Sequence, residues 1–197
     1  MRILLFSLCI LLQQFAIAQL STEPLIRTDK ITIARDAYGV PHIFAPTDPE
    51  VAYGLAWAHA EDDFTTIQTL ILTGKGKLAT YLGKKGAPVD YVFGLLNTKA
   101  TVLTQINSLD PKLILLVKGY LAGLEAFAKA HPDKVLNKNV FPITIEDYLA
   151  TTVFSIALAT FLENFISPKY KSSSMSKILL ISCFGIQSVW PLALGLI

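Results

Sequence analysis

Three histidines and one acidic run are the side chains most suited to chemistry in this 197-residue sequence. His42, His59 and His131 lie far apart, and no two have the i, i+4 spacing that places metal ligands on one helix face. The acidic run 61–63 could hold a cation, but consecutive helical positions point to different sides, which favours a solvated or capping role. No serine lies in a G-x-S-x-G elbow. The residues therefore predict no catalytic group and no metal site.

A short basic segment, 73–77 (TGKGK), superficially resembles a phosphate-binding loop. It lacks the G-x-x-x-x-G-K-[ST] spacing of such loops, so a solvated basic loop tip is the favoured interpretation. The whole chain carries a net charge of only +2, and its lysines form no basic stripe. The sequence therefore predicts no nucleic-acid partner.

The first residues have the pattern of a cleavable export signal. Arg2 precedes a short apolar run, and residues 16–18 (AIA) close the segment with the small-x-small pattern of a cleavage site. Residues 1–18 are therefore predicted to be a signal peptide, and the mature chain is expected to begin at Gln19. This predicts an exported protein, either periplasmic or extracellular.

The last 31 residues, 167–197, differ in composition from those before them. Residues 167–177 are polar and low in complexity, and residues 178–197 contain no charged side chain. Twenty uncharged, mostly apolar residues are long enough to span a membrane. However, the lysines at 169, 171 and 177 precede this run on the exported side, which opposes the positive-inside rule. Membrane contact by 178–197 therefore remains an alternative.

The segments between these ends predict a mainly α fold with a short N-terminal β-hairpin. Residues 30–35 alternate apolar and polar side chains, 36–39 form a turn, and 40–45 can return as a second strand. Helices are expected from a capping box at 47–50 to about residue 71, and over about 110–130 and 145–165. A lysine-rich loop is expected up to about residue 89. The helix at 145–165 is apolar almost all round, which predicts burial against a larger partner.

One constellation of residues carries a family resemblance. Residues 33–43 (IARDAYGVPHI) are followed by 53–63 (YGLAWAHAEDD), and then by GKGKL and YLG within 74–83. This pattern resembles the opening of the penicillin acylase family, which includes the acyl-homoserine-lactone acylases. Its residues are interpreted as structural, with Arg35 and Asp36 pinning a tight turn and Gly54 letting a helix press against the sheet. The motif residues are Arg35, Asp36, Tyr38, Gly39, Val40, Pro41, His42, Tyr53, Gly54 and Asp62.

The resemblance implies that residues 19–166 are the α-chain portion of an αββα N-terminal nucleophile hydrolase whose core β sandwich is missing. Members of the family hydrolyse linear amides in penicillins, acyl-homoserine lactones or other N-acyl compounds. Their nucleophile is the serine that begins a separate β chain, with its own α-amino group as the base. The expected partners are therefore a β chain and, only in a complete enzyme, a small N-acyl substrate.

The resemblance also suggests a substrate pocket. The apolar candidates are Phe154, Phe161 and Phe165, with ordinary core packing as the alternative. Family members often hold a calcium ion through one α-chain acid, and Glu163 lies in that neighbourhood, but the role cannot be assigned to it. No cofactor is therefore predicted.

Two explanations of the chain remain open because it contains no G-S-N start of a β chain. It could be a truncated acylase, inactive alone, whose tail at 167–197 arises from a frameshift. It could instead be a non-catalytic accessory or tail-anchored α-like subunit that binds a separately encoded β chain. In either case, uncovered apolar faces would make the isolated chain prone to aggregation.

Overall fold

The computed structural model describes residues 23–161 of the chain. The predicted signal at 1–18 and tail at 167–197 lie outside the described residues, as do Glu163 and Phe165. Within 23–161, no helix has both the length and the apolar character needed to cross a membrane. The possible membrane segment 178–197 is outside that range.

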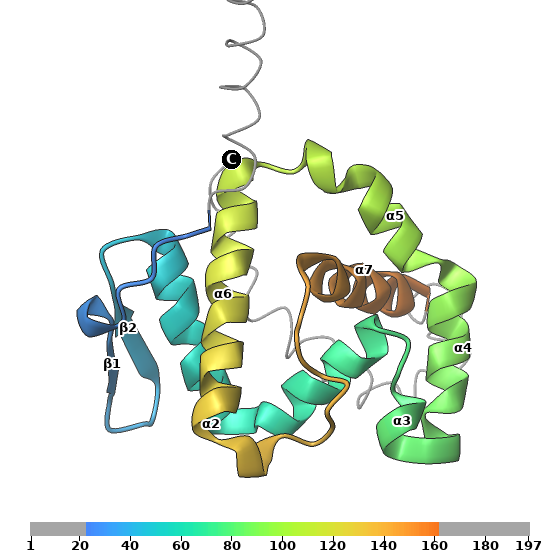
Figure 1. Ribbon diagram of the computed structural model, residues 1–197, viewed down its shortest axis with the longest axis horizontal. Coiled ribbons are helices and arrows are strands. Elements are labelled where there is room, and N and C mark those ends of the chain that lie inside the picture. Colours follow the sequence, from blue (N-terminus) through green and yellow to red (C-terminus); the bar gives the residue numbers. More distant parts are fainter. Residues whose placement is uncertain (1–22, 162–197) are drawn as a thin grey trace, which may run out of the picture.

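The elements follow one another as a hairpin and then a series of helices (Figure 1). The strands are β1 (Thr32–Arg35) and β2 (Pro41–Phe44), and the helices are α2 (Asp48–Gly74), α3 (Ala79–Leu82), α4 (Ala87–Leu96), α5 (Thr98–Gln105), α6 (Pro111–Ala130) and α7 (Ile145–Phe161). Short 3₁₀ turns occupy Thr28–Lys30, Gly83–Lys85, Ile106–Ser108 and Pro132–Lys134. The predicted mainly α fold with an N-terminal β-hairpin is confirmed.

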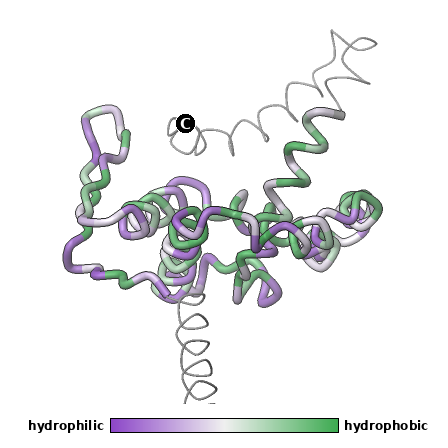
Figure 2. The backbone as a smooth tube through the Cα atoms, turned by 90° about the horizontal axis from the view of Figure 1, so that it is seen from above, coloured by the Kyte–Doolittle hydropathy of each residue, from purple (hydrophilic) through white to green (hydrophobic). Residues whose placement is uncertain are grey.

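The hairpin lies against the N-terminal half of α2. Its strands are antiparallel, with Thr32 opposite Phe44 and Arg35 opposite Pro41. A Cβ atom on Gly54 would lie 2.7 Å from Cγ2 of Ile43, so any larger residue here would force the hairpin side chains to shift. Figure 2 shows the hairpin projecting at one end from the layer of helices.

α2 is the central helix, and it bends at Asp63. That residue has φ −154° and ψ 74°, which are not helical values. Its carboxylate accepts hydrogen bonds from the backbone N–H of Thr66 at 3.0 Å and from the Thr66 hydroxyl. Asp63 therefore caps the second half of α2, which runs to Gly74.

The main hydrophobic core forms where α6 crosses α2. Gly119 and Gly123 of α6 face the backbone oxygens of Pro49 and Tyr53 so closely that neither position has room for a Cβ atom. This close crossing brings large side chains from both helices together. The largest of the fully buried apolar side chains in this core are Leu72, Leu124 and Phe127.

The predicted lysine-rich loop before residue 89 is partly helical in the structure. α3 begins within it, and α4 already begins at Ala87. The reason is a contact from further along the chain: Asp90 of α4 accepts hydrogen bonds from the backbone N–H groups of Leu78 and Ala79, both at 2.8 Å. These bonds satisfy free donors at the start of α3, as an N-cap residue would.

Candidate functional site

Two charged side chains make hydrogen bonds across the turn of the family motif. Arg35 donates from Nη1 to the backbone oxygen of Gly39 at 2.8 Å. Asp36 Oδ1 accepts from the N–H groups of Tyr38 and Val40, both at 2.9 Å. The Val40 and Tyr38 N–H bonds, with help from His42, hold the pKa of Asp36 below its usual value. Gly39 has φ +82°, a conformation that favours glycine at this tight turn.

Arg35 also ties this turn to α2. Its Nη2 atom lies 2.8 Å from Oδ1 of Asp62 and 3.1 Å from Oε2 of Glu61. The other carboxylate oxygen of Glu61 accepts a hydrogen bond from the indole of Trp57 at 3.0 Å. The acidic run 61–63 is therefore used for ion pairing and, at Asp63, for helix capping.

The remaining motif residues do not gather around a common point. Tyr38 is 92% exposed and Val40 is half-exposed at the tip of the hairpin. His42 lies 3.5 Å from the Asp36 carboxylate through Nε2. The backbone oxygen of Tyr53 lies against Gly123 of α6, where a Cβ atom would collide with it. Together with Arg35, these contacts anchor the hairpin to α2. The structural role of the motif residues stays a prediction.

Beneath the hairpin, Glu50 makes an enclosed ion pair that the sequence did not reveal. Its side chain is fully buried and accepts from the Arg27 backbone N–H at 3.0 Å, Nε at 2.8 Å and Nη2 at 3.0 Å. Together with the Thr47 hydroxyl, Arg27 lowers the pKa of Glu50 to about 2. The capping box at 47–50 correctly marked the start of α2, but Thr47 makes no side-chain cap bond to the helix backbone. The carboxylate instead turns to Arg27.

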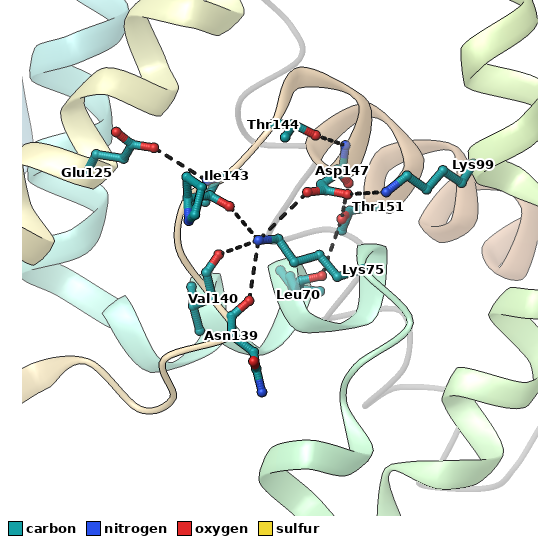
Figure 3. Close-up of polar contacts among 11 residues, drawn as sticks. Leu70, Lys75, Lys99, Glu125, Asn139, Val140, Ile143, Thr144, Asp147 and Thr151 are labelled. Carbon is teal, nitrogen blue, oxygen red and sulfur yellow. Dashed lines mark hydrogen bonds and ion pairs between the residues drawn. The ribbon is translucent and has the colours of Figure 1, made fainter.

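A second polar network lies at the other end of α2, around Lys75 (Figure 3). Its ammonium donates to the backbone oxygens of Asn139 at 3.3 Å, Val140 at 2.8 Å and Pro142. It also lies 3.7 Å from Oδ2 of Asp147 in α7, and the Lys75 side chain is only 10% exposed. The interpretation of 73–77 as a solvated basic tip is therefore wrong for Lys75, because the 139–142 loop folds over it.

Asp147 is shared between two lysines. Lys99 Nζ of α5 lies 2.7 Å from its Oδ1, on the carboxylate oxygen not used by Lys75. Burial works against ionisation of Asp147, but the Lys99 and Lys75 ammonium groups together hold its pKa below the usual value. Burial lowers the pKa of Lys75, and Asp147 opposes that effect. No local sequence signal could reveal this network, because the carbonyl groups follow Lys75 by more than sixty residues.

Phe154 is the one predicted pocket residue whose side chain the structure describes. It is 5% exposed and lies in a second core cluster with Phe93, Val102 and Ala150. Its ring centroid is 5.4 Å from that of Phe93, in an edge-to-face arrangement. Phe161 ends α7, but its side chain is not described, and Phe165 lies outside the described residues. The pocket role of the three phenylalanines stays a prediction.

His59 is held in aromatic packing. Its Nδ1 atom lies 3.2 Å from the hydroxyl of Tyr120, whose ring in turn contacts Tyr148. Burial lowers the pKa of His59, raises that of Tyr120 and raises the pKa of Tyr148 to about 12. The lowered pKa of His59 favours the neutral imidazole, which is held against Tyr120 between α2 and α6.

His131 is held in a similar way, because its ring stacks on Phe127 with centroids 4.2 Å apart. Among residues 23–161, no group of three or more histidine, cysteine or acidic side chains is placed to hold a metal ion.

Comparison with known proteins places these features in a family. The family model described as penicillin amidase matches residues 30–173. The acyl-homoserine lactone acylase PvdQ of Pseudomonas syringae pv. syringae is 28% identical over 148 residues, which cover 68% of this chain and 19% of that protein. Penicillin G acylase of Escherichia coli is 27% identical over 143 residues, covering 70% of this chain and 17% of the relative. The chain thus spans less than a fifth of the length of these relatives.

A solved structure supports the fold. The described helices and hairpin are similar to a chain of the thermostable penicillin G acylase from Alcaligenes faecalis, with a TM-score of 0.54 and 23% identity. The match covers 71% of this chain and 85% of that chain. Because the family model extends over more than half of the sequence, this chain belongs to the penicillin amidase family.

Proposed function

We propose that this chain is the α-type part of an amide hydrolase that cleaves the linear amide bond of N-acyl compounds such as penicillins or acyl-homoserine lactones. The nucleophile and its base would come from a β-type segment, either following in the same precursor or encoded separately. The chain alone would then bind no substrate productively and would have no turnover. We further propose export through residues 1–18, which fits a precursor that matures outside the cytoplasm.

The observation that carries this proposal is the apolar surface left uncovered by the described residues. On the helices, Tyr91 and Leu95 of α4 are 71% and 69% exposed, and Ile156 of α7 is 54% exposed. On the hairpin, Tyr38 and Phe44 are 92% and 62% exposed. Exposed apolar side chains on several elements are typical of a surface that another chain covers.

α7 is the element through which this chain would take part in substrate selection. Phe154 and Phe161 are seven residues apart, which places them on one face of the helix, and Phe165 extends that spacing. Phe154 is fixed by Phe93, so its ring could form a rigid wall of an acyl pocket that the β-type segment completes. The proposal assigns these residues apolar contact with the acyl chain and no part in bond cleavage.

Co-expression with a β-type chain tests the proposal. The full chain would be produced alone, with the β chain of the E. coli penicillin G acylase, and with that of the P. syringae acyl-homoserine lactone acylase. Amine release from penicillin G and from an N-acyl-homoserine lactone would be measured in each preparation. We expect co-purification and turnover with at least one β chain, and no turnover by the chain alone.

A matched control uses the same β chains with their N-terminal serine replaced by alanine. These complexes should still form but should release no amine. Turnover by the isolated chain, or equal turnover with the alanine β chains, would overturn the proposal. A stable complex without turnover would favour the accessory subunit instead, and failure to bind either β chain would count against both.

A further inference from the structure

Lys75 ends in an environment built almost entirely from oxygen atoms. Three backbone oxygens, from Asn139, Val140 and Pro142, converge on its Nζ atom, and a carboxylate oxygen of Asp147 lies at 3.7 Å (Figure 3). Carbonyl and carboxylate oxygens are the ligands that hard cations prefer in proteins. The side chains of Lys75 and Asp147 are 10% and 6% exposed, so little water reaches this point.

The loop and the carboxylate that surround Lys75 also have anchors of their own. On one side of the loop, Gln68 accepts from the Leu136 N–H at 2.8 Å and donates to the Lys134 oxygen at 3.0 Å. On the other side, Glu125 accepts from the Ile143 N–H at 3.4 Å. Lys99 fixes the second oxygen of Asp147. The loop that folds over Lys75 is therefore anchored on both sides of the oxygens that it contributes.

We propose that these four oxygens form a cation site whose resident cation is the Lys75 ammonium, and that this site fixes the start of α7 on the C-terminal end of α2. Lys75 is the C-cap residue of α2, and its backbone N–H bonds to Ile71 and Thr73 hold it at the helix end. Its side chain places the positive charge between the 139–142 loop and α7. Because the ammonium is part of the chain, the site needs no free cation.

We expect the position of α7 to depend on the Lys75 contact because α2 and α7 pack closely at this point. Thr151 donates to the Leu70 oxygen at 3.3 Å, and a Cβ atom on Gly74 would collide with Thr151 and with the backbone oxygen of Asp147. Losing the Lys75 ammonium would leave three carbonyl groups and the Oδ2 atom of Asp147 facing one another at this tight junction, with Lys99 as the remaining partner of Asp147. On the proposed function, Lys75 is then a positioning residue for Phe154 in the acyl pocket.

Chemical rescue tests the site. Lys75→Ala removes the ammonium and leaves a channel, and ethylammonium chloride supplies a free ammonium of similar size. In the full chain, or in its complex with a β-type chain, we expect Lys75→Ala to lower Tm. Ethylammonium should raise that Tm along a curve that levels off with concentration, as a bound ligand does. Sodium chloride at equal ionic strength controls for screening.

Two further variants separate a cation site from ordinary packing. Lys75→Met fills the channel without a charge, so it should melt below the wild type and should not respond to ethylammonium. Lys77→Ala removes a nearby exposed lysine and should change neither Tm nor the response. A Lys75→Met chain as stable as the wild type would overturn the proposal, as would a Lys75→Ala chain that responds no more than Lys75→Met.

The same experiment still decides if Lys75→Ala does not fold on its own. Refolding would then be measured with and without ethylammonium, and the cation should increase the folded yield. An equal yield in both conditions overturns the proposal. Because these readouts are melting and folding, they do not depend on turnover, so failure of the proposed amide hydrolase function would leave them unchanged.

Discussion

Two of the ion networks that hold α2 differ in exposure. In the network that ties the hairpin turn to the middle of α2, just before the kink, the side chains of Arg35, Glu61 and Asp62 are 31%, 43% and 55% exposed. At the α7 end, those of Lys75 and Asp147 are 10% and 6% exposed. The hairpin network lies within the first two segments of the family motif, whereas only Lys75 of the α7 network lies in a motif segment, GKGKL. We therefore expect the less exposed network to contribute more to stability.

Water explains the difference between the two networks. An exposed ion pair gains little, because solvent and salt already screen its charges. In a buried pair, removing one partner leaves the other charge without water or a counter-charge. The hairpin network is therefore expected to orient the turn while contributing little to the free energy of unfolding. The junction between α2 and α7 should depend strongly on Asp147.

The largest effect should come from Asp147→Asn. This change leaves the Lys75 ammonium with carbonyl groups alone, and Lys99 without its partner. We expect the free energy of unfolding to fall by about 3 kcal/mol, as for other broken buried pairs. Urea unfolding followed by circular dichroism measures this. The matched control, Asp62→Asn at the hairpin end, should change stability only marginally, and equal losses in both variants would contradict the comparison.

Added methyl groups should rank the two ends in the same order. A Cβ atom on Gly74 would meet the backbone oxygen of Asp147, which cannot move without shifting α7. A Cβ atom on Gly54 would meet side-chain methyl groups of Ile43 and Ile31, which can turn away. We expect Gly74→Ala to cost about 2–3 kcal/mol and Gly54→Ala less, as judged by urea unfolding. A larger loss for Gly54→Ala would show that the hairpin contact is the stiffer one.

Acid should weaken the hairpin end through Glu50. Arg27 lowers the pKa of Glu50 to about 2 from an ordinary value of 4.5. A carboxyl with a lowered folded-state pKa stabilises the protein fully above pH 4.5, and that contribution is lost as the pH falls towards 2. Glu50→Gln should therefore flatten the dependence of Tm on pH between 5 and 2. Unchanged steepness would indicate that other acids, including Asp147, account for the loss.

Local sequence signals predicted the elements whose partners lie nearby. The turn at Asp36 uses N–H groups two and four residues away, and the hairpin and the start of α2 follow from equally short patterns. The kink at Asp63 was missed although its bonded partner, Thr66, is close. An acidic residue within an apolar-periodic helix gives no sign that it caps a new segment, since solvated acids look the same.

Contacts between distant segments could not be predicted in this way. The sequence predicts a loop where α3 lies because its capping acid, Asp90, is eleven or twelve residues beyond the N–H groups that donate to it. Lys75 was taken for a solvated tip because its carbonyl partners belong to the loop before α7. Backbone oxygens carry no sequence identity, so a site built from them leaves no pattern of residue types.

The smallest effect is expected at an unsatisfied buried hydroxyl near the α7 junction. Within residues 23–161, Thr98 Oγ1 is the buried side-chain oxygen that lacks a hydrogen-bond partner, at the start of α5 next to Lys99. A buried hydroxyl without a partner costs desolvation energy, whereas a methyl group of the same shape does not. We expect Thr98→Val to raise the free energy of unfolding by about 1 kcal/mol. Thr101→Val, at an exposed hydroxyl bonded to the Asn97 oxygen, should give no such gain. A loss of stability in Thr98→Val would mean that the hydroxyl is hydrogen-bonded in solution, and the α7 end would then have no unsatisfied side chain to improve.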